Sequence, residues 1–188
     1  MGNLIQSMPG HSYSTFDDKA FNHDGCIVDL GCVHWDWSNI FIGKKRVIGA
    51  DPFETTIPEG FDLFQGVVGP FNGSIAMTYA HDASAISINS TTEDSKLFPM
   101  YSWKTFCKKF NIDNISILKM NIEGSEYSLL NSMDADDFAK IDQLIVSFHD
   151  WLVPEWINQT LASTYLLEQN GFTVTNIGPY NWCIALRQ

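Results

Sequence analysis

Acidic residues and a glycine follow the apolar run that begins at Cys26, where they could bind a nucleotide-like ligand. Asp29-Leu30-Gly31 ends this run, and Asp51 stands twenty residues after Gly31. A glycine turn followed at this interval by an acidic residue is typical of βαβ units that hold the two hydroxyls of a ribose. A structural alternative stays open, in which Asp51 only caps a turn.

A second group of polar residues lies in residues 117–130, with the sequence ILKMNIEGSEYSLL. Lys119 is flanked by apolar residues, so we expect a carboxylate partner for it. Asn121, Glu123 and Glu126 surround a glycine that opens a helical pattern. Polar side chains at the end of a strand suit ligand binding or catalysis. Helix capping is the alternative, with Glu126 favourable in the first turn.

The third group is Ser-Phe-His-Asp-Trp at residues 147–151. His149 could act as a general base oriented by Asp150 or Glu123. It could also ligate a metal together with Glu123, or simply form hydrogen bonds near the core. Spacing alone does not choose among these roles, and we assign no residue as a metal ligand.

These groups require a sheet whose strands end side by side. Apolar runs predict strands at 26–30, 46–51, 61–69, 74–79, 84–88, 115–120, 143–149, 172–177 and 181–187. Helical spacing predicts helices at 100–110, 124–133 and 154–170. Apolar strands that alternate with helices indicate a mostly parallel sheet covered on both faces. The short turn at 178–180 requires its two strands to be antiparallel neighbours.

Ligands of such sheets bind at the carboxyl ends of the strands. We therefore expect the functional residues to meet at one edge, in four segments: 29–37, 51–53, 119–126 and 147–151.

Composition excludes several classes of protein. The 188 residues, 45% of them apolar, suit one domain, which we divide into an N-terminal arm (1–24) and a main domain (25–188). The net charge of −11 argues against a nucleic-acid partner. No leader and no apolar run of about 18 residues is present, so we expect a cytoplasmic protein without a membrane partner. The four dispersed cysteines predict buried free thiols.

Together, these motifs resemble the FkbM-type family of S-adenosylmethionine-dependent methyltransferases. Family members carry Asp-x-Gly-Ala-Asn-x-Gly after the first strand, then Glu-Pro, then Leu-Lys-x-Asp-x-Glu-Gly-x-Glu, and later a strand that ends near a histidine. The resemblance extends over about residues 25–188. The matching segments are Asp29-Leu30-Gly31-Cys32, Ala50-Asp51-Pro52, the stretch from Leu118 to Glu126, and Ser147-Phe148-His149.

The resemblance implies a class I methyltransferase fold: an α/β, Rossmann-like three-layer sandwich around a mostly parallel seven-stranded sheet with the last strand antiparallel. It implies S-adenosyl-L-methionine as cofactor and a hydroxyl of a sugar or small metabolite as acceptor. The residues expected to contact the cofactor are Asp29, Gly31, Cys32, Val33, Trp35, Asp51, Pro52 and Phe53, with Asp51 on the ribose. The expected catalytic residues are His149, Glu123 and Asn121, because a hydroxyl acceptor must lose its proton.

Some positions depart from the family pattern. Val33 replaces an asparagine, Trp35 the second loop glycine, Asp51 a glutamate, and both Asn121 and Ser147 an acid. These changes support an alternative function, a binding or interaction module that keeps the fold without the chemistry. The chain has little room for a substrate-binding insertion, so the acceptor site would involve the N-terminal arm, residues 70–98 or a second subunit in a homo-oligomer.

Overall fold

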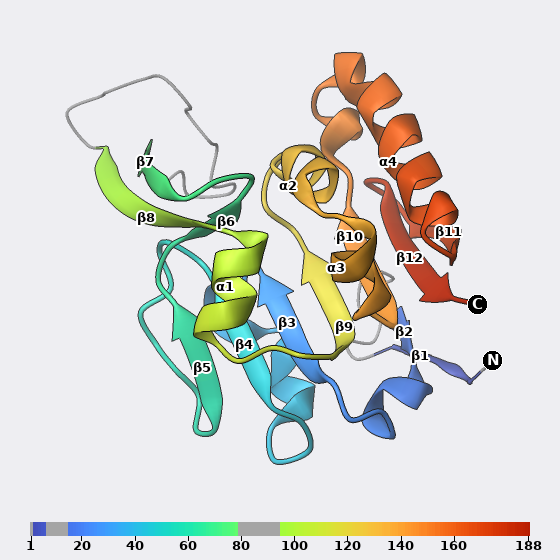
Figure 1. Cartoon of the computed structure of the whole chain (residues 1–188), viewed down its shortest axis with the longest axis horizontal. Helices are drawn as coiled ribbons and strands as arrows, with labels where there is room; N and C mark the ends of the chain where they lie inside the picture. Colours follow the sequence, from blue (N-terminus) through green and yellow to red (C-terminus); the bar gives the residue numbers. More distant parts are fainter. Residues whose placement is uncertain (1, 7–14, 79–94) are drawn as a thin grey trace.

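The computed structural model describes residues 2–6, 15–78 and 95–188, so the strand predicted at 84–88 lies outside the described residues. Within the described residues, seven strands form the central sheet (Figure 1). Their order is β11 (Phe172–Gly178), β12 (Trp182–Arg187), β10 (Gln143–Ser147), β9 (Ile115–Met120), β3 (Cys26–Leu30), β4 (Val47–Ala50) and β5 (Phe61–Phe64).

The strands from β10 to β5 are parallel, whereas β12 is antiparallel to both of its neighbours. This topology confirms the predicted α/β fold with its antiparallel last strand. It also brings the carboxyl ends of β3, β4, β9 and β10 to one edge, the upper edge in Figure 1.

Neighbouring residues of the central strands pack on opposite faces of the sheet, because side chains alternate along a strand. Val28 and Leu118 belong to the core beneath the α-helices, whereas Ile27 and Ile117 belong to the core on the other face. The first face carries α1 (Trp103–Lys109), α2 (Glu126–Ser132), α3 (Ala135–Ala139) and α4 (Ile157–Gln169).

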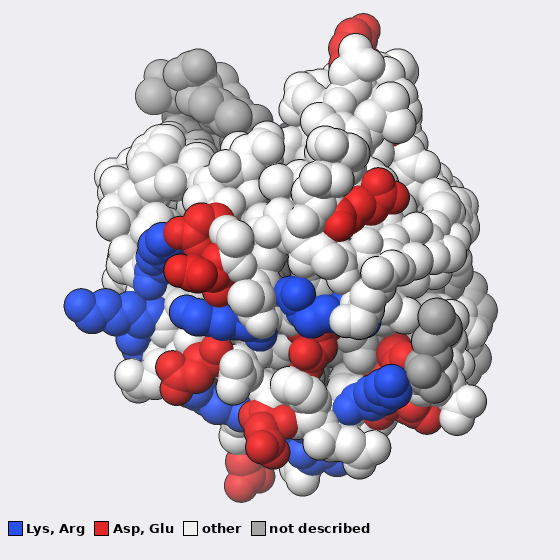
Figure 2. Space-filling model, turned by 45° about the vertical axis from the view of Figure 1, so that its right-hand side comes forward, with Lys and Arg blue, Asp and Glu red and all other residues white. Residues whose placement is uncertain are grey.

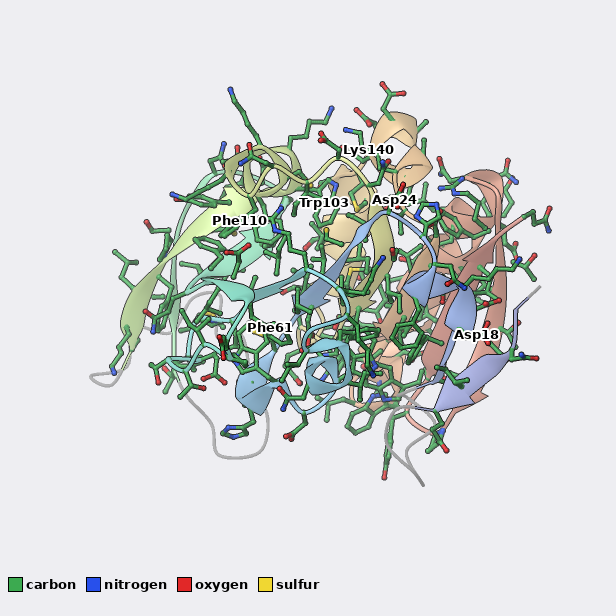
Figure 3. All side chains as sticks on the ribbon, turned by 90° about the horizontal axis from the view of Figure 1, so that it is seen from below. Asp18, Asp24, Phe61, Trp103, Phe110 and Lys140 are labelled. Carbon is green, nitrogen blue, oxygen red and sulfur yellow. The ribbon has the colours of Figure 1, made fainter. Side chains whose placement is uncertain are left out.

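The opposite face is covered by short segments instead of long helices (Figure 3). These are β1 (Leu4–Gln6), β2 (Thr15–Asp17) and the 3-10 helices η2 (Asp18–Phe21), η3 (Val33–Trp35) and η4 (Ser38–Phe41). Part of the predicted N-terminal arm thus packs on the main sheet. The backbone of Asp17 forms two hydrogen bonds, each 2.9 Å long, with the side-chain amide of Gln143 in β10.

The strand predicted at 61–69 is wrong as a single element. The chain leaves the main sheet after Phe64 and enters a smaller sheet of β6 (Val67–Gly69), β7 (Gly73–Met77) and β8 (Lys96–Ser102). Gly66 makes this transition possible, since a Cβ atom there would lie 2.5 Å from the ring of Phe64 and 2.6 Å from the carbonyl oxygen of Pro99.

Three other predicted boundaries also shift. The helix predicted at 100–110 begins only after Ser102, whose hydroxyl caps it by accepting a hydrogen bond from the Thr105 N–H. The helix predicted from residue 124 begins at Glu126, because Gly124 has a φ of +94°. The strand predicted at 143–149 ends at Ser147, where the chain turns into the 3-10 helices η5 (His149–Trp151) and η6 (Pro154–Trp156).

Basic and acidic residues are interspersed on the face in Figure 2, with no stripe of one sign. Among the described residues no helix has both the length and the apolar character that crossing a bilayer requires. All four cysteines are free thiols; Cys26, Cys32 and Cys183 are buried, and Cys107 is partly buried.

Candidate functional site

A buried ion pair joins the ends of β3 and β9. Nζ of Lys119 lies 2.9 Å from Oδ1 of Asp29 and donates a 2.8 Å hydrogen bond to the carbonyl oxygen of Gly31. Oδ2 of Asp29 accepts a hydrogen bond from the Ser38 hydroxyl at 2.8 Å. Asp29 is therefore the carboxylate partner predicted for Lys119, and both of its oxygens are engaged inside the protein.

Gly31 lets the first loop pass close to the segment after β9. Its φ is +79°, and a Cβ atom at this position would lie 2.0 Å from the carbonyl oxygen of Asn121. The backbone N–H of Asn121 in turn donates a 3.0 Å hydrogen bond to the carbonyl oxygen of Leu30. No residue with a side chain could occupy position 31 without moving the two segments apart.

The loop after Gly31 keeps a left-handed backbone without further glycines. His34 and Trp35 have φ values of +61° and +56°. The indole of Trp35 is buried in the core: it lies against Gly49 of β4, and its Nε1 donates to the carbonyl oxygen of Thr56 at 2.8 Å. Cys32 is buried beside it, and burial raises the pKa of its thiol. The large ring thus fills the part of the core that lies between this loop and β4.

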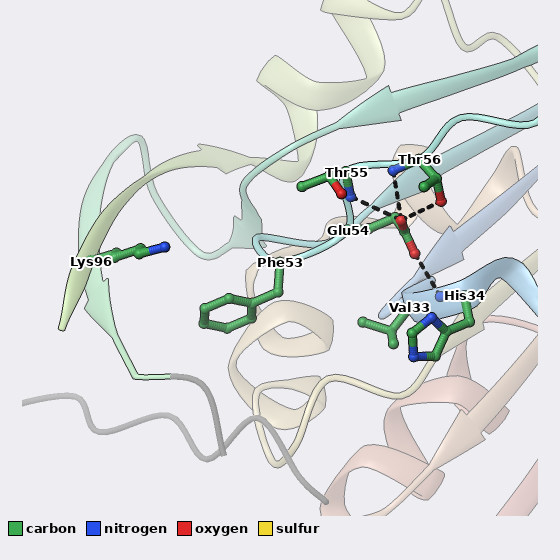
Figure 4. Close-up of a pocket in the computed structure, with 7 residues that line it drawn as sticks. All are labelled: Val33, His34, Phe53, Glu54, Thr55, Thr56 and Lys96. Carbon is green, nitrogen blue, oxygen red and sulfur yellow. Dashed lines mark hydrogen bonds between the residues drawn. The ribbon is translucent and has the colours of Figure 1, made fainter. Parts of the chain in front are cut away.

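Glu54, which the sequence analysis missed, ties this loop to the turn after β4. It accepts hydrogen bonds from the backbone N–H of His34 at 2.6 Å, from Thr55 and Thr56 N–H at 2.9 and 2.7 Å, and from the Thr56 hydroxyl at 2.6 Å (Figure 4). Burial favours a higher pKa for Glu54, but the hydrogen bonds outweigh it and lower the pKa. The charged carboxylate of Glu54 therefore holds the first loop against the turn after β4. The two threonines that follow Glu54 are typical of turns capped by side chains, and this pattern could have indicated its role from the sequence.

Asp51 was predicted to end its strand; it directly follows β4, which ends at Ala50, and it is buried. Its Oδ1 accepts hydrogen bonds from the N–H groups of Phe53 and Glu54, at 2.7 and 3.1 Å. Within the described residues no donor contacts Oδ2, which leaves this oxygen for a ligand. Burial raises the pKa of Asp51 despite these hydrogen bonds.

Two cavities lie beside this turn. The first has a volume of about 470 Å³ and is lined by Val33, His34, Phe53, Glu54, Thr55, Thr56 and Lys96 (Figure 4). The second, of about 400 Å³, includes Pro52, Phe53 and Phe98 in its wall. The rings of Phe53 and Phe98 meet edge to face, with centroids 5.0 Å apart. Of the predicted cofactor residues, Val33, Pro52 and Phe53 thus line cavities.

His149 lies between two glutamates of the segment after β9. Its Nδ1 is 3.2 Å from Oε1 of Glu126, and its Nε2 is 3.4 Å from Oε2 of Glu123. Burial would lower the pKa of His149, but the two carboxylates outweigh it and raise the pKa. Burial also raises the pKa of Glu123. The three groups therefore form a chain along which a proton can be held or moved.

The two glutamates differ in position. Glu126 is fully buried and accepts hydrogen bonds from the N–H groups of Ile122 and Gly124, at 2.7 and 2.8 Å. Glu123 has a φ of +56°, and its side chain is 20% exposed. Glu126 thus orients His149, a role the sequence analysis gave to Asp150 or Glu123. Asp150 instead accepts a hydrogen bond from the Asn181 amide.

Lys119 connects the histidine cluster to the first loop, because its charge acts on Glu123 while its ammonium group binds Asp29 and Gly31. Asn121 directly follows β9, lies against Gly31 and is partly exposed. In the described parts of the chain, no three His, Cys, Asp or Glu side chains are arranged to hold a metal ion.

Comparison with known proteins gives two similarities. Residues 57–174, more than half of the chain, match the model of the methyltransferase FkbM domain family. The fold is similar to the crystal structure of methyltransferase FkbM from Methylobacillus flagellatus KT, with a TM-score of 0.52 and 16% sequence identity. That similarity covers 87% of this chain but only 43% of the Methylobacillus protein. No curated protein matches the sequence significantly.

Proposed function

The chain belongs to the methyltransferase FkbM domain family, and we propose that it transfers a methyl group from S-adenosylmethionine to a hydroxyl of a sugar or small metabolite. The observation that carries the proposal is the arrangement of the upper sheet edge. There, Gly31 and Asp51 directly follow the neighbouring strands β3 and β4, and His149 follows the end of β10. The free thiols suit a reducing compartment such as the cytoplasm.

The residues at this edge fit a cationic nucleoside cofactor. S-adenosylmethionine carries a sulfonium, an ammonium and a carboxylate group, hence a net positive charge, and the edge is rich in carboxylates such as Asp51, Glu54 and Glu123. The cavity of about 470 Å³ falls within the range of small-molecule sites. Asp51 would hold the ribose through its free Oδ2, and Phe53 would offer an aromatic surface to the base.

When bound, the cofactor supplies an electrophilic methyl group on its sulfonium centre. The chain itself must remove the proton of the acceptor hydroxyl, and we assign this task to Nε2 of His149. Glu126, on the other ring nitrogen, holds the imidazole and stabilises its protonated form. Glu123, partly exposed beside Nε2, can receive the proton from the histidine.

A non-catalytic binding module is the second candidate. Two observations favour it: Asn121 stands where the family has an acid, and Glu54 occupies the His34 N–H that a ligand of the loop would otherwise use.

Calorimetric titration with S-adenosylmethionine and S-adenosylhomocysteine tests both functions. We expect binding of both, followed by transfer of labelled methyl groups to hydroxylated acceptors. No binding of either compound at millimolar concentration would exclude the methyltransferase. Binding of these compounds without methyl transfer to any acceptor would favour the non-catalytic binding module.

A further inference from the structure

Two exposed aromatic side chains stand next to the histidine cluster. The rings of Trp151 and Tyr180 meet at 60° with centroids 4.9 Å apart, although they come from η5 and from the turn between β11 and β12. Their exposed fractions are 47% and 60%. The ring of Trp151 also lies 6.0 Å from that of His149. The pair, here called the aromatic platform, therefore borders the proposed proton acceptor.

The backbone of this turn is not explained by packing. Tyr180 and Asn181 have φ values of +61° and +47°, in the left-handed region that Gly and Asn adopt most readily. A bulky residue in this conformation is uncommon and carries a conformational cost. Burial of the Tyr180 ring cannot offset this cost, because the ring is mostly exposed. Such outliers occur where a side chain is needed for function.

The platform is held in place from both sides. The side-chain amide of Asn181 donates to Oδ1 of Asp150, and the carbonyl oxygen of Asn181 accepts a hydrogen bond from the Phe148 N–H at 3.2 Å. The turn is thereby fixed to the residues on both sides of His149. A ligand that stacks on the rings would meet a preorganised surface, which lowers the entropic cost of binding.

The charges around the platform indicate the class of ligand. Residues 147–157 and 172–182 contain no lysine or arginine, but they do contain Asp150 and Glu155. A phosphorylated or carboxylated acceptor would therefore find no lysine or arginine in these two segments. The C–H groups on one face of a sugar ring are slightly positive and are attracted to the negative face of an aromatic ring.

We propose that Trp151 and Tyr180 form the acceptor subsite and that they bind an uncharged pyranose ring beside His149. That the subsite holds the methyl acceptor rests on the proposed function. Binding of the sugar itself can be measured without cofactor and without methyl transfer.

Saturation-transfer NMR on the full chain without cofactor tests the proposal. The probes are the methyl pyranosides of glucose, mannose and galactose, with glucose 6-phosphate as the charged probe. We expect transfer to the ring C–H protons of at least one neutral probe, and weaker transfer to glucose 6-phosphate. In the Trp151→Ala and Tyr180→Ala variants, the saturation-transfer signal of the neutral probes should be weaker by at least about fivefold. Tyr165→Ala is the matched control, since Tyr165 on α4 is 62% exposed and should leave the signal unchanged.

Two further variants separate binding from folding. Tyr180→Asn supplies a residue that the left-handed turn prefers, so its thermal unfolding midpoint should equal or exceed that of the wild type while sugar binding is lost. Tyr180→Phe should retain binding. The proposal is overturned by any of three results: no signal with any neutral pyranoside, an equal loss in Tyr165→Ala, or full binding by Trp151→Ala and Tyr180→Asn. A chain that binds pyranosides but not S-adenosylmethionine would overturn the proposed function and leave the subsite standing.

Discussion

The ring of Trp35 occupies the space that a side chain at Gly49 would need. A Cβ atom on Gly49 would lie 2.3 Å from Cη2 and 2.4 Å from Cζ3 of the indole. Trp35 stands where the family pattern has a glycine, and Gly49 in the adjacent strand makes room for its ring. The two positions are therefore structurally coupled, and the loop keeps its course because the large side chain is directed into the core.

The Gly49→Ala variant should destabilise the protein by about 1–3 kcal/mol, because the added methyl group overpacks a closed core. Urea unfolding measures this loss. Gly73→Ala is the matched control in another strand, since among the described residues its Cβ would approach only the ring of Phe71, at 3.7 Å. Equal stability of Gly49→Ala and the wild type would contradict the coupling of Trp35 and Gly49.

Replacement of Lys119 by Met should destabilise the protein by about 3–5 kcal/mol, because it leaves the buried carboxylate of Asp29 without its partner. The double variant Asp29→Asn/Lys119→Met should recover part of this loss. Arg46→Met is the control: it removes the exposed pair with Asp62 and the exposed hydrogen bonds to the carbonyl oxygens of Phe110 and Asn111, and it should cost less than Lys119→Met. Similar losses for Lys119→Met and Arg46→Met in chemical unfolding would show that Asp29 does not depend on Lys119.

The Asp51→Ala variant should weaken binding of S-adenosylhomocysteine by about 1–3 kcal/mol, the range for a lost hydrogen bond to a charged group. Calorimetric titration gives the change directly. Asp36→Ala removes an exposed carboxylate from the nearby loop and should leave the affinity unchanged. If both variants bind equally well, Asp51 does not hold the ribose.

The stability contributed by His149 should depend on pH. Burial opposes the charged imidazole, but Glu126 and Glu123 outweigh it and raise the pKa above its usual value of 6.5. The folded pKa thus exceeds the unfolded one, so this contribution is complete below pH 6.5 and decreases as pH rises through the folded pKa. The difference in unfolding free energy between wild type and His149→Gln should therefore shrink as pH rises above 6.5. A difference that stays constant or grows would refute the raised pKa.

Methyl transfer should fall by about a hundredfold or more in His149→Ala, while the affinity for S-adenosylmethionine stays nearly unchanged. The raised pKa also predicts that wild-type activity increases with pH above neutrality, because the histidine accepts a proton only when neutral. His23→Ala serves as control, since His23 is 48% exposed and pairs with Asp142 elsewhere on the chain. Equal activity of the two variants would remove His149 from the mechanism.

The strands that build the site were predictable because each is a mostly apolar run with polar residues at its carboxyl end. The sequence predicted that Lys119 has a carboxylate partner, but not which one. The parallel register of β3 and β9 decides this, because it places Asp29 directly opposite Lys119. The turn between β11 and β12 also followed from sequence, because so short a connection allows only antiparallel pairing.

Other features depend on contacts between distant residues, which no local pattern contains. The direction of the Trp35 ring is decided by the absence of a side chain at Gly49. The end of the strand after Phe64 depends on how closely Gly66 approaches Pro99. The orientation of His149 depends on Glu126, whose position in the first turn of α2 equally suits a helix-capping role.

The position of β12 constrains how the protein can be assembled during synthesis. β11 joins the main sheet only through β12, which follows it in the chain and separates it from β10. A nascent chain that has released residues 172–178 but not yet residues 182–187 lacks the strand with which β11 pairs in the folded sheet. We therefore expect β11 and β12 to enter the sheet together as a hairpin. Until then, the edge of β10 is open to other strands, including those of neighbouring nascent chains.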